Sequence, residues 1–300
     1  MPESQRDVRN RISSVANIQK ITRAMEMVAA ARLRRAEQRI GALRPYANAI
    51  ARMTRQAVGA AGGSVMSLPL LREHESESRA ALLLVSGDRG LAGAFNSQVL
   101  RAAIRAGAEL EAEGKQVVWY ASGRRGVSSL TFRGNEPRGA YVGFTDRPAY
   151  ADARQIADDL MAAYLDEQID RVEIVYNGYV SPLVQEVRRE VLMPLTAAAI
   201  LGEEEEHAQE NAGGKALVEY EPEPEQLLGR LVPDYVEISI YRALLESTAS
   251  EHGARMTAMR NASENAGELI TDLTLEMNRA RQAEITQEIL EVVAGAEGLG

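Results

Sequence analysis

Apolar and small residues recur with a helical spacing in the last quarter of the chain. After Pro233 no proline follows, and steps of three and four residues connect Leu245, Ala249, His252, Met256, Met259, Ser263, Ala266, Ile270, Leu273, Met277 and Ala280. This 3.5-residue period predicts a helix that pairs with another helix rather than lying on a globular core. At about 1.5 Å per residue, a helix of about 60 residues would form a shaft roughly 90 Å long.

The N-terminal segment has the same character. It contains neither Gly nor Pro from Glu3 to Ile40, and its apolar and small positions are Val8, Ile12, Val15, Ile18, Thr22, Met25, Ala29, Leu33, Ala36 and Ile40. The chain between the two helices must leave the end of one and return to the start of the other, so we expect them to pair in antiparallel fashion. We expect the first helix to continue past Pro45 towards Val58. A purely structural coiled coil would explain these patterns as well.

The middle of the chain predicts a different architecture. Residues 80–85 form an unbroken apolar run, which is typical of a buried parallel strand. We expect further strands at 117–121 and 172–176, an edge strand at 185–195, and helices after the first strand and over 152–165. Strands that alternate with helices indicate a small α/β domain with a largely parallel sheet.

The predicted fold class is therefore α/β plus a long antiparallel coiled coil. The N- and C-terminal helices form a shaft, and a small Rossmann-like α/β domain is inserted between them. The expected segments are a shaft helix at 1–58, a connector at 59–78, the α/β domain at 79–200, an acidic loop and linker at 201–232, and a second shaft helix at 233–300.

Charge and composition narrow the possible partners. The net charge is −9, yet residues 1–55 hold 12 Lys and Arg against 4 Asp and Glu. These basic residues are scattered around the predicted helix, which favours a solvated surface or an acidic protein partner over nucleic acid. The chain has no cysteine, which excludes disulfides and thiolate zinc sites. No apolar run approaches the 18 or so residues that span a bilayer, and the N-terminus lacks an apolar signal-peptide region, so we expect membrane association only through partners.

A glycine-rich loop after the first predicted strand is the main candidate for chemistry. Gly87, Gly90 and Gly93 lie between a strand and a helix, where backbone N–H groups can bind phosphate. The loop matches neither the P-loop nor the dinucleotide fingerprint. We favour a tight packing turn, in which Asp88 and Arg89 pair with each other or cap the turn. The three histidines lack metal-site spacing, and we expect no catalytic residue, metal or cofactor in this chain.

Four stretches resemble one known family, in order along nearly the whole chain. Residues 21–32 read I-T-R-A-M-E-M-V-A-A-A-R, residues 86–93 read S-G-D-R-G-L-A-G, residues 250–256 read S-E-H-G-A-R-M, and residues 278–288 read N-R-A-R-Q-A-E-I-T-Q-E. These segments are similar to the gamma subunit of F-type ATP synthases. Ala92 stands where the family often has cysteine, and the insert with regulatory cysteines found in chloroplast members is absent, so thiol control is not expected.

The resemblance implies a rotor without catalytic residues of its own. In that family the helices penetrate a hexameric head of alpha and beta subunits, while the α/β domain lies beside the epsilon subunit and the membrane-embedded c-ring. Rotation couples proton flow to ATP synthesis or hydrolysis. The resemblance also implies a peripheral location on the cytoplasmic side of a bacterial cell membrane.

Site residues follow from the same resemblance. It places Met25 and Arg255 near acidic loops of the beta subunits, and it assigns beta-subunit contacts to Arg281, Gln282 and Thr286. The apolar tip of the shaft would comprise Ile289, Leu290, Val292 and Val293, and the surface facing the c-ring would include Tyr220 and Glu221. Two alternatives stay open: an α/β module at about 78–200 that binds phosphate through the glycine loop, and a coiled coil that binds nucleic acid.

Overall fold

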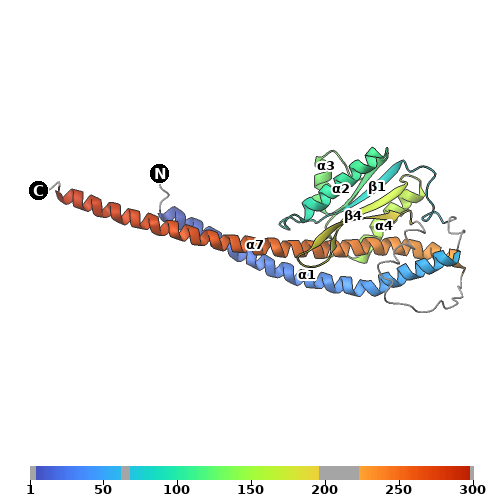
Figure 1. The fold of residues 1–300 in the computed structure, drawn as a ribbon, viewed down its shortest axis with the longest axis horizontal. Coiled ribbons are helices and arrows are strands. Elements are labelled where there is room, and N and C mark those ends of the chain that lie inside the picture. Colours follow the sequence, from blue (N-terminus) through green and yellow to red (C-terminus); the bar gives the residue numbers. More distant parts are fainter. Residues whose placement is uncertain (1–4, 62–67, 196–222, 298–300) are drawn as a thin grey trace. The chain divides into compact units, whose positions relative to one another are not determined.

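A computed structural model describes residues 5–61, 68–195 and 223–297 (Figure 1). The chain divides into two units. The first comprises Met1–Ala30 with Arg255–Gly300, and the second comprises Ala31–Ala254. Two long helices, α1 (Gln5–Ala61) and α7 (Pro224–Glu297), contribute residues to both units. No helix in the described ranges has the length and apolar character needed to cross a membrane.

The second unit contains a five-stranded sheet with the order β3-β2-β1-β4-β5. Its strands are β1 (Arg79–Val85), β2 (Gln116–Ser122), β3 (Gly139–Tyr141), β4 (Arg171–Tyr179) and β5 (Gln185–Met193). The first four strands are parallel, and β5 pairs with β4 in antiparallel fashion at the edge. The predicted parallel α/β sheet is thus confirmed.

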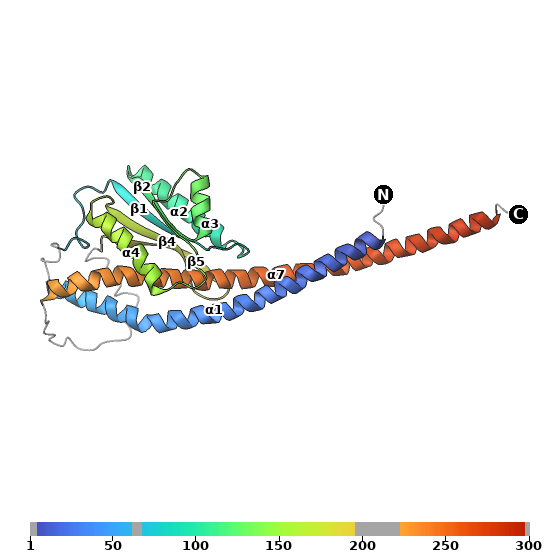
Figure 2. The ribbon, with the colours of Figure 1, turned by 180° about the vertical axis from the view of Figure 1, so that it is seen from behind.

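Helices cover both faces of this sheet (Figures 1 and 2). The faces alternate along β1, as the strand period of two requires. Leu82 and Leu84 pack with α2 (Phe95–Ala112) and α3 (Arg124–Phe132). Leu83 points to the opposite core, which it shares with α4 (Tyr150–Leu165), the end of α1 and the first part of α7. Because both faces are covered, β1 is apolar from Ala80 to Val85.

A buried carboxylate holds the start of the sheet together. Asp170, just before β4, accepts hydrogen bonds from the His74 ring at 2.9 Å, from Ser78 N at 2.9 Å and from Arg79 N at 2.8 Å. Burial by itself would raise the pKa of Asp170, but the hydrogen bonds from His74, Arg79 and Ser78 outweigh it and lower the pKa. The ionised carboxylate therefore joins β1 and β4 to the segment that precedes the sheet.

Several elements differ from the expected pattern. Helix α3 and the three-residue strand β3 had no counterpart in the expected elements. As expected, helix α1 continues past Pro45, and it ends at Ala61, three residues beyond Val58. Helix α7 begins at Pro224, before the expected start at 233, and buries Leu228 and Val232 in the core of the second unit. Proline is tolerated in the first turn of a helix, so Pro224 suits this start.

Candidate partner-binding surface

In the first unit, α1 and α7 pair in antiparallel fashion. Gln19 Nε2 donates a hydrogen bond to the Ser263 carbonyl at 3.2 Å, and Arg260 Nε donates to Glu26 Oε1 at 2.9 Å. Because the residue number falls along α7 as it rises along α1, the two helices run in opposite directions. The predicted antiparallel coiled coil is confirmed.

Small residues line the seam between these helices. Its buried members are Val8, Thr22 and Ala29 on α1, and Met259, Ala266 and Leu273 on α7. A Cβ placed on Gly267 would lie 2.9 Å from Gln19 Nε2, which shows how closely the helices approach there. Small side chains permit this approach but bury little apolar area per turn.

One predicted seam residue is wrong. Ile18 is 54% exposed, whereas the neighbouring Gln19 faces α7. The apolar spacing alone selects isoleucine for this position. A glutamine is accommodated instead because its amide donates to a backbone carbonyl of α7, so the polar group is satisfied inside the seam.

The predicted beta-subunit contacts lie in two places on the first unit. Met25 is half-buried and Arg255 is 8% exposed, so neither presents a fully open side chain. Arg281, Gln282 and Thr286 are all exposed on α7. The Thr286 hydroxyl donates to the Gln282 carbonyl at 2.8 Å, which leaves its oxygen able to accept a hydrogen bond from a partner. Their roles as contacts stay predictions, and the predicted c-ring residues, Tyr220 and Glu221, lie outside the described residues.

The end of α7 exposes apolar side chains. Every residue from Arg281 to Ala294 is exposed. This segment, called the apolar end of α7 below, includes Ile285, Ile289, Leu290, Val292 and Val293. Exposed apolar patches mark interaction sites more often than free surface. The last four of these residues were predicted as the tip of the shaft, whereas Ile285, one helical turn before Ile289, was not and extends the same patch.

In the second unit the α/β domain is bound firmly to the first part of α7. Besides the shared apolar core, several polar contacts connect them. They include Tyr150 with Glu237 at 2.6 Å, Arg188 with Glu246 at 3.1 Å, Glu190 with Arg242 at 2.8 Å, Ser250 with the Asn177 carbonyl at 3.1 Å, and Thr248 with the Thr145 carbonyl at 2.8 Å. Burial raises the pKa of Glu246, since its desolvation outweighs the attraction of Arg188 and Arg242. We call this set of contacts the α7 joint.

The glycine-rich loop is filled by the protein's own groups. The Asp88 carboxylate accepts hydrogen bonds from Arg124 N, at the start of α3, from Gly143 N, both at 2.9 Å, and from the Thr145 hydroxyl at 3.0 Å. At the start of α2, Asn96 Oδ1 accepts from Gly87 N at 2.9 Å. Asp88 therefore occupies the anion position that a phosphate would take at a helix N-terminus.

Close packing explains the glycines around this loop. Gly123, which precedes α3, has φ of 93°, and a Cβ there would lie 2.1 Å from the Ser86 carbonyl oxygen. A Cβ on Gly126 would lie 2.6 Å from Ser86 Oγ. These contacts support the packing interpretation of the loop over the phosphate-binding one. Within the described residues, no cluster of three or more His, Cys, Asp or Glu side chains has a geometry suited to a metal ion.

Together, the helix pair of the first unit and the α/β domain of the second define a class of protein: an α/β domain inserted between chain-terminal helices that form a coiled coil. Comparison with known proteins places the chain within that class. The family profile described as ATP synthase matches residues 4–299. The ATP synthase gamma chain of Rubrobacter xylanophilus is 44% identical over 99% of this chain and 98% of its own length, and that of Streptomyces avermitilis is 44% identical over 97% and 94%. The chain belongs to the ATP synthase gamma chain family.

Solved structures share the fold at low sequence identity. A chain of the mitochondrial ATP synthase of Euglena gracilis, from a structure of OSCP, F1 and c-ring in rotational state 3, has a TM-score of 0.64 at 17% identity, with coverage of 98% of this chain and 94% of that one. A chain of the central stalk and c-ring structure of Tetrahymena thermophila mitochondrial ATP synthase has a TM-score of 0.59 at 24% identity, with coverage of 81% and 99%. At these identities the likeness supports the fold alone.

Proposed function

We propose that this chain is the central-stalk rotor subunit of an F-type ATP synthase and that it is not itself catalytic. It transmits torque between a membrane c-ring and an alpha/beta catalytic head, and so couples proton flow to ATP synthesis or hydrolysis. Membership of the gamma chain family supports this role. The observation that carries the proposal concerns helix α7. Its first part packs in the core of the α/β domain, and its last part exposes apolar side chains that a partner could cover.

Torque transmission requires a joint that does not slip. The α7 joint combines an apolar core with ion pairs between Arg188 and Glu246 and between Arg242 and Glu190. Partly buried charge pairs resist displacement, because separating them leaves a charge without its partner. A load on the α/β domain would thus pass to α7 without local unfolding.

The proposed partners follow from the surfaces and the family. The apolar end of α7 suits a sleeve formed by the alpha and beta subunits, and Arg281, Gln282 and Thr286 provide donors and acceptors for beta-subunit loops. Met25 and Arg255 would contact acidic beta loops, while Tyr220 and Glu221 would face the c-ring. The epsilon subunit would bind the α/β domain. The structural neighbours belong to assemblies that contain F1 or the central stalk together with the c-ring, which supports this set of partners.

We further propose that the chain needs no cofactor and reaches the membrane only through partner subunits. It would lie at the cytoplasmic side of a bacterial cell membrane. The curated relatives of bacterial origin support the bacterial assignment.

Reconstitution tests the rotor proposal. The full chain is mixed with separately purified alpha and beta subunits, and the products are analysed by size and by ATP hydrolysis. We expect one copy to assemble into a single large complex with sustained hydrolysis. The double substitution Arg281→Ala and Gln282→Ala should weaken assembly or lower the rate of hydrolysis at least about tenfold, because it removes the hydrogen bonds of both side chains to the beta-subunit loops.

A matched control is Arg230→Ala, an exposed arginine at the start of the same helix. It should leave assembly and turnover unchanged. If the chain stays apart from the alpha and beta subunits while the full chain binds a nucleotide, the rotor proposal is wrong and the phosphate-binding alternative gains support.

A further inference from the structure

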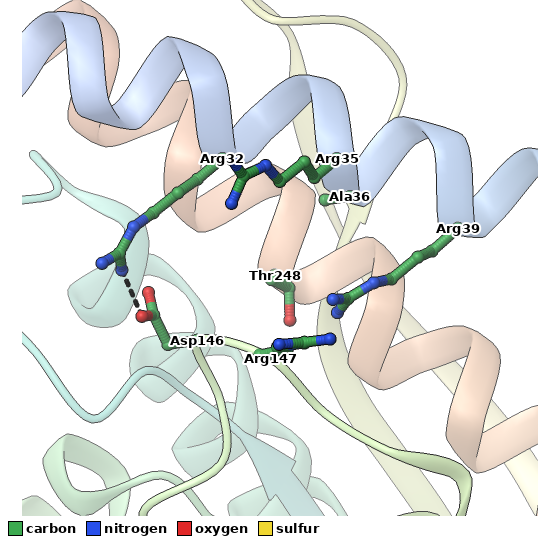
Figure 3. A pocket seen from close by; sticks show the side chains of 7 residues that line it. All are labelled: Arg32, Arg35, Ala36, Arg39, Asp146, Arg147 and Thr248. Carbon is green, nitrogen blue, oxygen red and sulfur yellow. Dashed lines mark hydrogen bonds and ion pairs between the residues drawn. The ribbon is translucent and has the colours of Figure 1, made fainter.

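Four arginines of the second unit surround one cavity (Figure 3). The cavity has a volume of about 270 Å³. It is lined by Arg32, Arg35, Ala36 and Arg39 of α1, by Asp146 and Arg147 of the loop before α4, and by Thr248 of α7. Two segments that are distant in sequence, α1 and the loop before α4, thus bring guanidinium groups to the same space, and α7 contributes Thr248.

The only carboxylate in this lining is already engaged. Asp146 pairs with Arg32, and Arg89 lies 3.9 Å from the same carboxylate oxygen. The His252 ring approaches the other oxygen of Asp146 at 3.6 Å. The charge of Asp146 is therefore shared with Arg32 and Arg89 and does not offset the remaining arginines of the lining.

Three guanidinium groups remain uncompensated. Across the ranges 5–61, 68–195 and 223–297, no carboxylate lies within ion-pair distance of Arg35, Arg39 or Arg147. In Figure 3 the side chains of Arg39 and Arg147 extend towards one another, with the Thr248 hydroxyl beside them. Like charges that face one cavity repel each other, so the site is electrostatically suited to an anion.

We propose that this cavity binds a multivalent oxyanion of the size of phosphate or diphosphate. Guanidinium groups form paired hydrogen bonds with phosphate oxygens, and several arginines in one site favour more than one negative charge. The volume is several times the roughly 30 Å³ of one water molecule, which gives room for such an anion with its remaining waters. Thr248, which is 4% exposed, forms a buried polar wall. Its hydroxyl already donates its proton to a backbone carbonyl, so its oxygen can accept one bond from a protonated phosphate oxygen or from a water molecule.

An acidic segment of a partner protein is the competing occupant. The concave arrangement favours the small anion: the guanidinium groups converge from α1 and from the loop at 146–147 on a cavity rather than forming a flat stripe along one helix. An acidic peptide would also have to bring its backbone over the exposed Arg35 and Arg147 side chains. A direct binding titration distinguishes the two occupants, because a small-anion site binds phosphate or diphosphate alone, whereas a peptide site binds an acidic peptide and neither of these anions.

Calorimetric titration of the full chain with inorganic phosphate, and separately with diphosphate, tests the proposal. The buffer contains chloride, and ionic strength is held constant. We expect one saturable site with a dissociation constant of about 1 mM or tighter, and tighter binding of diphosphate. Arg39→Gln and Arg147→Gln should each weaken binding at least about tenfold, because each removes charged hydrogen bonds to the anion.

Arg34→Gln is the matched control, because Arg34 is an exposed arginine of the same helix outside the cavity. It changes the net charge equally and should leave binding unchanged. Trp119 fluorescence and circular dichroism verify that each variant is folded. The proposal is wrong if neither anion gives a saturable signal, or if Arg34→Gln weakens binding as much as Arg39→Gln does. It is also wrong if an oligoglutamate peptide binds while phosphate and diphosphate do not.

Discussion

Asp88 is the residue whose removal tests the structural interpretation of the glycine-rich loop most directly. Its carboxylate joins the first turn of α3 to the loop at 143–145 through three hydrogen bonds of 3.0 Å or less. Hydrogen bonds to a charged group contribute about 1.5–3 kcal/mol each when buried. Asp88 is half-buried, so water replaces part of each bond, and about 1 kcal/mol per bond is the appropriate value.

We therefore expect Asp88→Ala to lower the free energy of unfolding by about 3 kcal/mol. Asp88→Asn keeps one acceptor oxygen but loses the charge that favours a helix N-terminus, so its loss should be about half as large. Urea denaturation measures both values. Trp119, the single tryptophan of the chain, lies buried in β2 and reports unfolding of the α/β domain by fluorescence.

Asp166→Ala provides the control for these variants. Asp166 is an exposed aspartate after α4 with no side-chain hydrogen bond among the described residues. Its replacement should change stability by less than about 0.5 kcal/mol. If Asp88→Ala and Asp166→Ala unfold at the same urea concentration, the carboxylate does not hold the loop, and the anion position beside α3 would be open to a ligand.

Three further variants test other parts of the structure. Gly123→Ala should lower the free energy of unfolding by at least about 3 kcal/mol, because the new Cβ would clash with a backbone oxygen at a residue of positive φ. A urea midpoint equal to that of the wild type would contradict the described turn. Leu273→Ala in the seam should lower the free energy of unfolding of the helix pair, measured by circular dichroism, by about 2–4 kcal/mol. Leu275 is 54% exposed, so Leu275→Ala should change this free energy little. Equal effects of the two substitutions would contradict the described seam. Asp170→Asn should cost about 2–3 kcal/mol at pH 7. Because the folded-state pKa of Asp170 is lowered, its stabilisation is present above about pH 4 and is lost as pH falls through the folded pKa, so urea midpoints of variant and wild type should converge at low pH.

The sequence predicts those elements whose pattern is set by their own residues. The run at 80–85 is buried on both faces, and its apolar composition alone identifies β1 as a central strand. The edge position of β5 was predicted from Pro194, which follows the strand and cannot donate to a sheet ladder. Helix α3 and strand β3 escape prediction for the opposite reason. The sequence of α3 is rich in Arg and Ser, and β3 is three residues long, so tertiary contacts decide both.

Sequence periodicity also leaves the phase of a coiled coil partly open. The step from Val15 to Thr22 passes through either Ile18 or Gln19 with equally acceptable spacing. Hydrophobicity selects Ile18, but the structure uses Gln19 because the carbonyl of Ser263 accepts its amide. This choice depends on which groups the partner helix presents, and the spacing along one helix gives no information about them.

The network around Asp88 is similarly non-local. The loop at 87–93 is visible in the sequence as three glycines, and its two possible roles are visible as well. To decide between these two roles, one must know that the backbone N–H groups of residues 124 and 143, far along the chain, both donate to the Asp88 carboxylate. A self-supplied anion at a helix N-terminus and a bound phosphate satisfy the same donors, so only the fold distinguishes them.

The two units differ in how they are stabilised, and this difference argues for a partner. The α/β domain has a core of large aliphatic and aromatic residues, whereas the seam of the first unit relies on small residues such as Thr22, Ala29 and Ala266. The segment from Arg281 to Ala294 buries no residue, although several of its side chains are large and apolar. An isolated helix of this length is marginal in water, because helical stability in proteins comes chiefly from tertiary packing. The proposed sleeve of other subunits around the end of α7 would supply that packing.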